Sequence, residues 1–201
     1  MNRIITVGRQ FGSGGRELGR RLAEELGFEY YDREIIAEIA KRTELSQEYV
    51  RNVIEHQPHH LFPITVGHSF AYLDHHTVQK LQKIYAEQAA VIREMAEKSD
   101  CVIVGRCADH ILRDFKPFRI FVYADMESRV NRCMEHMAEN NEHFSKKQLI
   151  RHIRAVDRDR AKYFAFYTDK TWGAKENYDL SVNTTDVSIP EIAKTLAGMF
   201  R

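Results

Sequence analysis

The residues with the most chemical content are glycines and arginines near the start of the chain, in the run Gly8-Arg9-Gln10-Phe11-Gly12-Ser13-Gly14-Gly15-Arg16-Glu17. Glycines let backbone N–H groups turn toward a bound anion, and a helix that begins after them adds the positive end of its dipole. A guanidinium such as that of Arg16 binds phosphate oxygens well. We therefore predict a phosphate-binding loop, in which donor phosphates contact Gly12, Ser13, Gly14, Gly15, Arg16 and Glu17.

This loop departs from the usual phosphate-binding motif, G-x-x-x-x-G-K-[ST]. In one register Arg9 takes the first glycine position, and Gly14-Gly15-Arg16 falls where Gly-Lys-Ser/Thr is expected. In the other register the loop is one residue longer, Gly8 and Gly15 are the fixed glycines, and Arg16 replaces the lysine. Neither register has a lysine, or a following hydroxyl to hold Mg²⁺. A glycine-rich turn without a ligand is the alternative interpretation.

A second concentration of charge lies in residues 151–162, where arginines and aspartates alternate and aromatic residues follow. Charge runs on helices usually face solvent. Here the cationic residues fall on more than one helical face, and phosphoryl transfer requires several cations around the transferred group. We therefore favour phosphate contact for this cluster, and we name Arg154 and Arg158 as candidate catalytic residues beside Arg16.

Short apolar runs separated by amphipathic helices must position these residues. Strands are predicted at 4–7, 29–31, 101–104, 118–123 and 178–183. This alternation predicts an α/β fold with a mostly parallel sheet, and ligands in such sheets bind beyond the carboxyl ends of the strands. Asp32 and Arg33 follow the second strand and Arg106 follows the third, so we expect them near the glycine loop. A helix N-cap is the alternative for Asp32, and a surface ion pair is the alternative for Arg106.

Helix boundaries are indicated by polar residues before apolar periodic segments. Ser46 is predicted to cap a helix, and Ser145 and Ser188 each begin a capping box. A long helix is predicted from about residue 74 to 98, a shorter one at about 108–114, and a charged one at about 126–139. The pattern between residues 57 and 67 predicts a loop.

Composition bounds the class of protein. The chain has 201 residues, of which 43% are hydrophobic and 29% charged, which indicates one globular domain, or one domain with a small inserted lobe. The net charge of +1 gives no reason to expect nucleic acid or a membrane surface as a partner. The three cysteines lack metal-ligand spacing, and no apolar run is long enough to cross a membrane, so we expect a cytoplasmic protein. The oligomeric state is left open.

Several motifs, in order along the chain, resemble the cytidylate kinase-like family. They are Gly-Ser-Gly-Gly-Arg-Glu, Tyr-Tyr-Asp, Cys-Val-Ile-Val-Gly-Arg-Cys-Ala-Asp, Asp-Arg-Asp-Arg-Ala-Lys-Tyr-Phe, Tyr-Thr-Asp-Lys-Thr-Trp-Gly and Tyr-Asp-Leu-Ser-Val-Asn-Thr. That family is similar to nucleoside monophosphate kinases of the P-loop class. The resemblance implies a single three-layer α/β/α P-loop kinase domain over residues 1–201, with a helical acceptor-side lobe at about 43–98 and a lid-like helical region at about 126–160.

The resemblance also implies residue roles and ligands. ATP is the expected donor, with Mg²⁺, and Gly12 to Arg16 face its phosphates. Small nucleotides are the expected partners, and the acceptor contacts are those of Asp32, Arg33, Arg106, Arg158 and Asp159, with Arg129 and Arg132 as lid-side arginines. True cytidylate kinases carry Gly-Lys and a hydroxyl in the loop, and an aspartate where this chain has Cys107.

Three functions are therefore weighed. The first is ATP-dependent phosphoryl transfer to a nucleoside monophosphate, cytidylate-like, or to a similar small acceptor. The second is a non-catalytic nucleotide-binding module with a degenerate loop, and the third is a small-molecule kinase with a non-nucleotide acceptor. Six histidines at positions 56–76 could be taken for a metal site. We favour a polar lobe without metal there, and the ligands of Mg²⁺ remain unknown from the sequence.

Overall fold

A parallel sheet forms the centre of the computed structural model, which describes residues 2–55, 75–139 and 144–200. Within these residues five strands pair in the order β2-β3-β1-β4-β5. Every pairing is parallel, so the carboxyl ends of the strands meet at one edge. The predicted sheet is confirmed. The strands are β1 (Ile4–Arg9), β2 (Glu29–Tyr31), β3 (Cys101–Val104), β4 (Phe118–Tyr123) and β5 (Leu180–Asn183), so the last one begins two residues later than expected.

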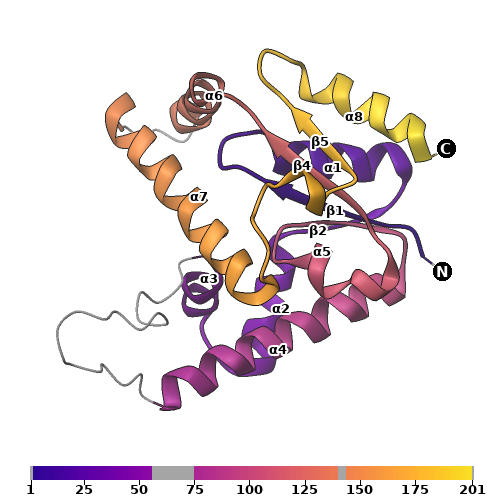
Figure 1. Ribbon diagram of the computed structural model, residues 1–201, viewed down its shortest axis with the longest axis vertical. Coiled ribbons are helices and arrows are strands. Elements are labelled where there is room, and N and C mark those ends of the chain that lie inside the picture. The colour runs from indigo at the N-terminus through magenta and orange to yellow at the C-terminus, as the bar shows by residue number, and fades with distance from the viewer. Residues whose placement is uncertain (1, 56–74, 140–143, 201) are drawn as a thin grey trace.

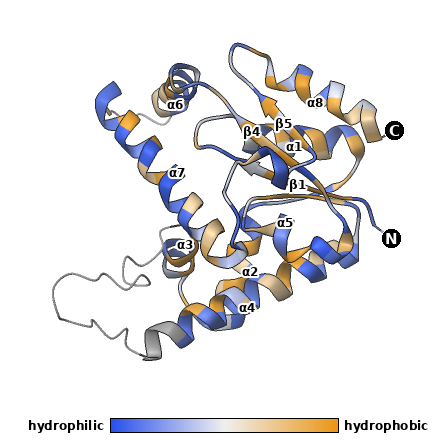
Figure 2. Cartoon of the chain, viewed as in Figure 1, coloured by the Kyte–Doolittle hydropathy of each residue, from blue (hydrophilic) through white to orange (hydrophobic). Residues whose placement is uncertain are grey.

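Helices cover both faces of the sheet, which makes three layers (Figure 1). Alternate strand residues point to opposite faces. Ile5 and Val7 therefore pack with one set of helices, whereas Ile4 and Ile103 pack with the other. The first set is α1 (Gly15–Leu26) and α8 (Ile189–Ala197); the second includes α2 (Arg33–Thr43), α3 (Gln47–Glu55), α4 (His75–Lys98) and α5 (Ala108–Ile111). Figure 2, coloured by hydropathy, shows hydrophobic residues in orange along the strands and alternating with hydrophilic residues along the helices.

Two further helices lie beside the carboxyl edge of the sheet, α6 (Met126–Glu139) and α7 (Lys146–Thr168) (Figure 1). They pack on each other through a separate apolar cluster that contains Val130, Leu149 and Ile153. The other end of α7 is anchored differently, because Tyr163 and Phe164 belong to the main core, where α7 contacts α3 and the Tyr163 hydroxyl bonds to Gln88 of α4. The helix α7 thus connects the core with α6.

The helix ends match the sequence in part. The Ser145 hydroxyl accepts a hydrogen bond from the Gln148 N–H at 3.3 Å, and the Gln148 side chain accepts one from the Ser145 N–H at 2.9 Å, which confirms that capping box. The Ser46 hydroxyl likewise accepts from the Tyr49 N–H at 3.1 Å. Ser188 occupies the N-cap position of α8 but its side chain makes no cap hydrogen bond, so the second predicted capping box is wrong.

The remaining segments differ from the sequence in detail. The helix predicted at 108–114 is split, because α5 ends at Ile111 and a 3-10 turn, η1 (Arg113–Phe115), follows. Two more 3-10 turns are η2 (Lys175–Asn177) and η3 (Gly198–Phe200). The loop predicted at 57–67 and most of the histidine-rich segment lie outside the described residues. Among the helices that are described, none is both long and apolar enough to cross a membrane.

The two serine N-caps allow a matched test of how much a cap hydrogen bond stabilises its helix. Replacing Ser145 by alanine removes a made cap hydrogen bond and should lower the free energy of unfolding by about 1 kcal/mol. Replacing Ser188 by alanine removes no such bond, and the change should stay within about 0.5 kcal/mol. Urea unfolding of both variants measures the difference. Equal losses in the free energy of unfolding would mean that the cap hydrogen bonds of Ser145 do not stabilise α7.

Candidate functional site

The glycine loop joins β1 to α1 at the carboxyl edge of the sheet. Gly12 and Gly14 both have positive φ, of 75° and 77°. A Cβ on Gly12 would lie 2.8 Å from the Arg129 carbonyl oxygen, and a Cβ on Gly14 would lie 2.7 Å from Cδ1 of Ile189. Glycine is therefore required at both positions by the backbone conformation and by the close approach of α6 and α8.

The loop is held in place by groups from distant parts of the chain. The Phe11 N–H donates to Oδ1 of Asp157 at 2.8 Å, and Nε of Arg129 donates to the Phe11 carbonyl at 2.7 Å. Arg129 also forms an ion pair with Asp157, and its side chain is 5% exposed. On the other side the Thr184 hydroxyl donates to the Ser13 carbonyl at 2.7 Å. The loop is consequently fixed by α6, α7 and the residue after β5 before any ligand binds.

The loop offers no free hydroxyl from Ser13. This residue is fully buried, and its hydroxyl donates to the Gln10 carbonyl at 2.8 Å. The hydroxyl that the sequence lacks at the motif position is therefore not replaced by Ser13.

Arg132 contacts the loop from α6. Its guanidinium donates to the Thr184 carbonyl and lies 3.5 Å from the Gly12 carbonyl.

Arg16 and Asp32 form an ion pair at the start of α1. Nε of Arg16 lies 2.6 Å from Oδ2 of Asp32; the side chains are 50% and 4% exposed. Asp32 occupies the N-cap position of α2, but its side chain makes no cap hydrogen bond, so the N-cap alternative does not explain it. Its second oxygen, Oδ1, is buried and has no hydrogen-bond partner in the described part of the chain. One carboxylate oxygen thus remains able to accept a bond from a ligand.

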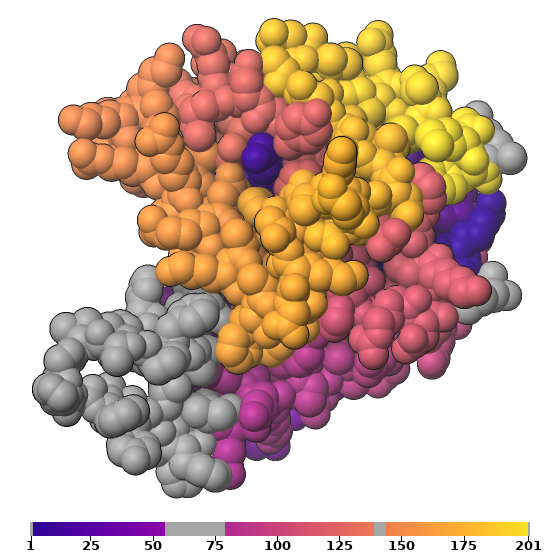
Figure 3. All heavy atoms as spheres, viewed as in Figure 1, coloured from indigo at the N-terminus to yellow at the C-terminus, as the bar shows by residue number. Residues whose placement is uncertain are grey.

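A large open pocket of about 870 Å³ follows the glycine loop. At one end its lining includes Arg16, Asp32 and the exposed Arg33, and at the other it includes Arg132 and His152. The ring of Phe11 meets that of His152 edge to face at 5.2 Å, on the side of the pocket formed by α7. Figure 3 shows N-terminal atoms, in indigo, at the bottom of a hollow between coral and orange atoms of later segments.

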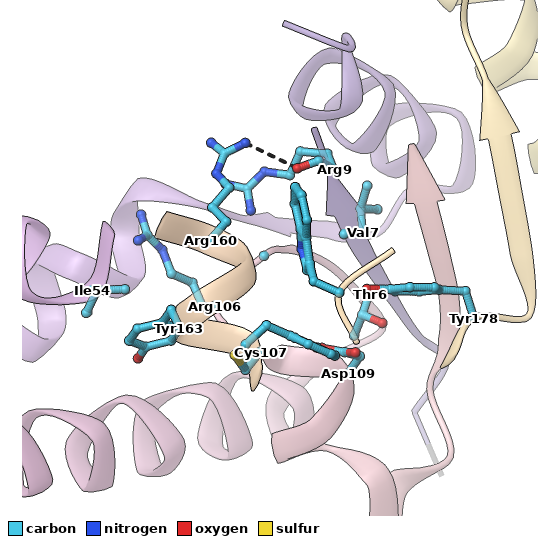
Figure 4. A pocket seen from close by; sticks show the side chains of 14 residues that line it. Thr6, Val7, Arg9, Ile54, Arg106, Cys107, Asp109, Arg160, Tyr163 and Tyr178 are labelled. Carbon is cyan, nitrogen blue, oxygen red and sulfur yellow. Dashed lines mark hydrogen bonds between the residues drawn. The ribbon is translucent and has the colours of Figure 1, made fainter. Parts of the chain in front are cut away.

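A smaller cavity of about 60 Å³ adjoins the large one on the side of β3. Arg9 and Arg160 line both, so the two pockets meet at these arginines. Figure 4 shows Arg9, Arg106 and Arg160 on one side of the smaller cavity and Asp109 on the other; Nη1 of Arg160 donates to the Arg9 carbonyl at 3.2 Å. Burial raises the pKa of Asp109 to about 6. The cavity is therefore cationic at its junction with the larger pocket.

Arg106 is buried and lies in a left-handed turn. Gly105, Arg106 and Cys107 have φ values of 76°, 60° and 51° in succession. The turn is held from α4, because Nε2 of Gln88 donates to the Arg106 carbonyl at 3.0 Å. The Tyr163 hydroxyl of α7 donates in turn to the Gln88 side chain at 3.3 Å. Left-handed backbone at non-glycine residues costs energy and is common at functional sites. The surface ion pair proposed as the alternative for Arg106 does not fit a residue that is 7% exposed.

The other residues named from the sequence lie elsewhere. Arg154 and Arg158 are exposed on α7, and neither belongs to the lining of the two pockets. Asp159 is 3.9 Å from Arg158. Arg160 belongs to the charged cluster at 151–162 but was not singled out as a site residue, and both it and Arg9 line the two pockets. Gln88, which holds the turn at Arg106, was not predicted from the sequence. Arg160 could have been found, since positions 153, 157, 160 and 164 share one face of a helix with the apolar residues of α7.

No resident metal site is apparent in the described ranges. No group of three or more His, Cys, Asp or Glu side chains within them is arranged to hold a metal ion. The six histidines considered as metal ligands lie at positions 56–76. Their side chains are outside the described part of the chain, so the structure does not test that alternative.

Two ion pairs in the described ranges join α6 to α7, and they allow a controlled test of how the loop is held. Replacing Asp157 by alanine leaves the buried Arg129 guanidinium without its carboxylate, so the free energy of unfolding should fall by about 3 kcal/mol or more. Glu127 and Lys146 join the same helices at 3.9 Å, but both are exposed. Replacing Glu127 by alanine should therefore change stability by less than about 0.5 kcal/mol. Similar losses in chemical denaturation of the two variants would contradict a special role for the buried pair.

The chain was compared with known protein families and with solved structures. The profile of the cytidylate kinase-like family matches residues 4–186. The chain is 25% identical to an uncharacterized protein from Eubacterium ventriosum of known crystal structure, with 98% of each chain covered and a TM-score of 0.68. A search of curated proteins found no match.

Two solved shikimate kinases share the fold at low identity. The enzyme from Acinetobacter baumannii, solved in complex with shikimate, is 14% identical, with 100% of this chain and 93% of that chain covered and a TM-score of 0.54. The enzyme from Bacteroides thetaiotaomicron is 13% identical, with 98% of each chain covered and a TM-score of 0.57. These likenesses support the α/β/α P-loop kinase fold. The family match supports phosphoryl transfer as the general class of reaction. The chain belongs to the cytidylate kinase-like family.

Proposed function

We propose that the protein transfers the γ-phosphoryl group of ATP to a nucleoside monophosphate, of which cytidylate is the first candidate, or to a similar small acceptor. The observation that carries this proposal is the junction of two pockets at the glycine loop, with arginines where they meet. A donor in the larger pocket and an acceptor whose phosphate enters the smaller cavity would bring their phosphates together there. Phosphoryl transfer depends mainly on such positioning and on charge neutralisation.

The donor is proposed to lie in the larger pocket, with its phosphates over residues 12–17. The first turn of α1 leaves N–H groups without helical partners, and these suit phosphate oxygens. Mg²⁺, expected with ATP, would neutralise phosphate charge. Oδ1 of Asp32 fits a role in holding that ion, since Mg²⁺ is usually bound through carboxylates and retained waters. Asp32 would also keep the Arg16 guanidinium at the edge of the donor site.

The acceptor phosphate is proposed to bind Arg106 and Arg160, with Arg33 at the mouth of the larger pocket. Arg106 supports this role because it is buried, directly follows a central strand and has its backbone held by Gln88. The lobe at about 43–98 would cover the acceptor, and the region at about 126–160 would serve as the lid. Arg154 and Arg158 lie outside the pockets in this structure, so any contact with the transferred group would require α7 to move.

A coupled assay of ADP release, run with each nucleoside monophosphate in turn, tests the function. Release that depends on one acceptor and on Mg²⁺ is the expected result. The competing function, a nucleotide-binding module without catalysis, is favoured by the Ser13 hydroxyl, which is committed to the Gln10 carbonyl. Tight ATP binding by calorimetry without release on any acceptor would support that alternative and reject the kinase.

The acceptor role of Arg106 can be separated from a general effect on the enzyme. Replacing Arg106 by alanine should raise the KM for the acceptor about tenfold or more and leave the KM for ATP within about twofold, because the guanidinium would bind one substrate alone. Arg113 is a control from the following turn, with an exposed side chain. Its replacement by alanine should change neither KM. Equal increases in both KM values for the Arg106 variant would place that residue elsewhere in the mechanism.

A further inference from the structure

We propose that Arg9, at the carboxyl end of β1, supplies the cation that binds the terminal phosphates of the nucleotide donor, and that Gly15 is glycine in order to make room for it. The inference rests on the proposed function, because a polyphosphate is the ligand assigned to the donor pocket. In this arrangement the charge that the usual motif places on a lysine of the helix comes from the preceding strand.

The first support is the use of space at Gly15. This residue is buried in the first turn of α1, and its φ is not in the left-handed range, so the backbone does not demand glycine. Glycine inside a helix costs up to about 1 kcal/mol relative to alanine, so a packing reason is expected. A Cβ there would overlap Cβ of Arg9 and lie 3.1 Å from its Cγ. The Arg9 side chain therefore fills the space into which a lysine at position 15 would extend.

The second support is where the Arg9 side chain ends. A Cβ on Gly105 would overlap Nη1 of Arg9 and lie 2.7 Å from its Cζ. The side chain thus extends from the first turn of α1 to the turn after β3, across the carboxyl edge of the sheet. Arg9 also lines both pockets, so its guanidinium lies near their junction. A phosphate bound between the two pockets would meet this group.

The third support is charge. In the described ranges the Arg9 side chain has no recorded hydrogen bond or ion pair, whereas Arg16 is paired with Asp32 at 2.6 Å. Burial, followed by the nearby cations of Arg160 and Arg106, lowers the pKa of Arg9 well below its ordinary value, and Asp32 opposes this. A partly buried guanidinium among like charges is unfavourable unless an anion completes the site. A polyphosphate is the anion that this pocket is built to admit.

Binding of inorganic tripolyphosphate and of a non-hydrolysable ATP analogue, followed by calorimetry, tests the inference. Replacing Arg9 by methionine should weaken both ligands roughly 10- to 100-fold, the range of one or two charge-assisted bonds, and should leave cytidylate affinity within about threefold. Arg3 lies just before the opposite end of β1, and Arg3→Met should change neither affinity. If Arg9→Met weakens cytidylate but not tripolyphosphate, Arg9 belongs to the acceptor and the inference is overturned.

Further variants test whether Arg9 and a side chain at position 15 compete for the same space. They do not rely only on removing the Arg9 charge. Gly15→Ala should weaken tripolyphosphate binding by displacing Arg9, although alanine favours the helix. The double variant Arg9→Gly/Gly15→Lys should bind tripolyphosphate at least fivefold more tightly than either Arg9→Gly or Gly15→Lys, since glycine at position 9 removes the Cβ that a side chain at position 15 would overlap. A double variant that binds no more tightly than the better of the two single variants, or an Arg16→Ala loss larger than that of Arg9→Met, would overturn the inference.

The two proposals fail in different ways. If no acceptor supports ADP release but tripolyphosphate binding still depends on Arg9, the proposed kinase function fails and the inference stands. If ADP is released and Arg9→Met binds tripolyphosphate as tightly as the unaltered protein, the inference fails and the kinase stands. An unaltered protein that does not bind tripolyphosphate at all would also overturn the inference.

Discussion

The buried contact among Arg129, Asp157 and the Phe11 backbone is the constraint on which the site depends. Both polar groups of Phe11 are used, since its N–H bonds to Asp157 and its carbonyl to Arg129. Removal of either side chain would leave a charge in a place from which water is largely excluded, so the three groups stay together. The glycine loop is therefore already shaped when a ligand arrives, which lowers the entropy lost on binding. Any movement of α7 near Asp157 must carry the loop with it.

Much of the fold could be predicted because local patterns determine it. The strands are short apolar runs, and the helices between them force parallel pairing, so the edge at which Asp32 and Arg106 meet the glycine loop follows from chain order. The Ser145 cap was predictable because its partner Gln148 is three residues away. Ser188 has the same pattern but its side chain makes no cap hydrogen bond, and Pro190 in the first turn of α8 has no N–H to donate.

The parts that could not be predicted are contacts between distant residues. The pairing of Arg16 with Asp32 and the position of Arg9 between Gly15 and Gly105 depend on how α1 approaches the sheet, which no local pattern encodes. The arginines of α7 are an intermediate case. Their types indicated phosphate chemistry, and helical spacing could have separated Arg160 from Arg154 and Arg158, but the contact of that face with the pockets depends on how Tyr163 packs in the core.

The left-handed turn at Gly105, Arg106 and Cys107 bears on how the protein can change over evolution. Strain in such a turn costs on the order of 1 kcal/mol or more for each non-glycine residue, and Gln88 and Tyr163 hold it from two other helices. Substitutions that relaxed the turn would raise stability and at the same time release Arg106 from its orientation. Selection for a more stable chain and selection for a well-placed arginine therefore act against each other at this turn. Gln88 of α4 affects both properties, because its side chain holds the Arg106 backbone.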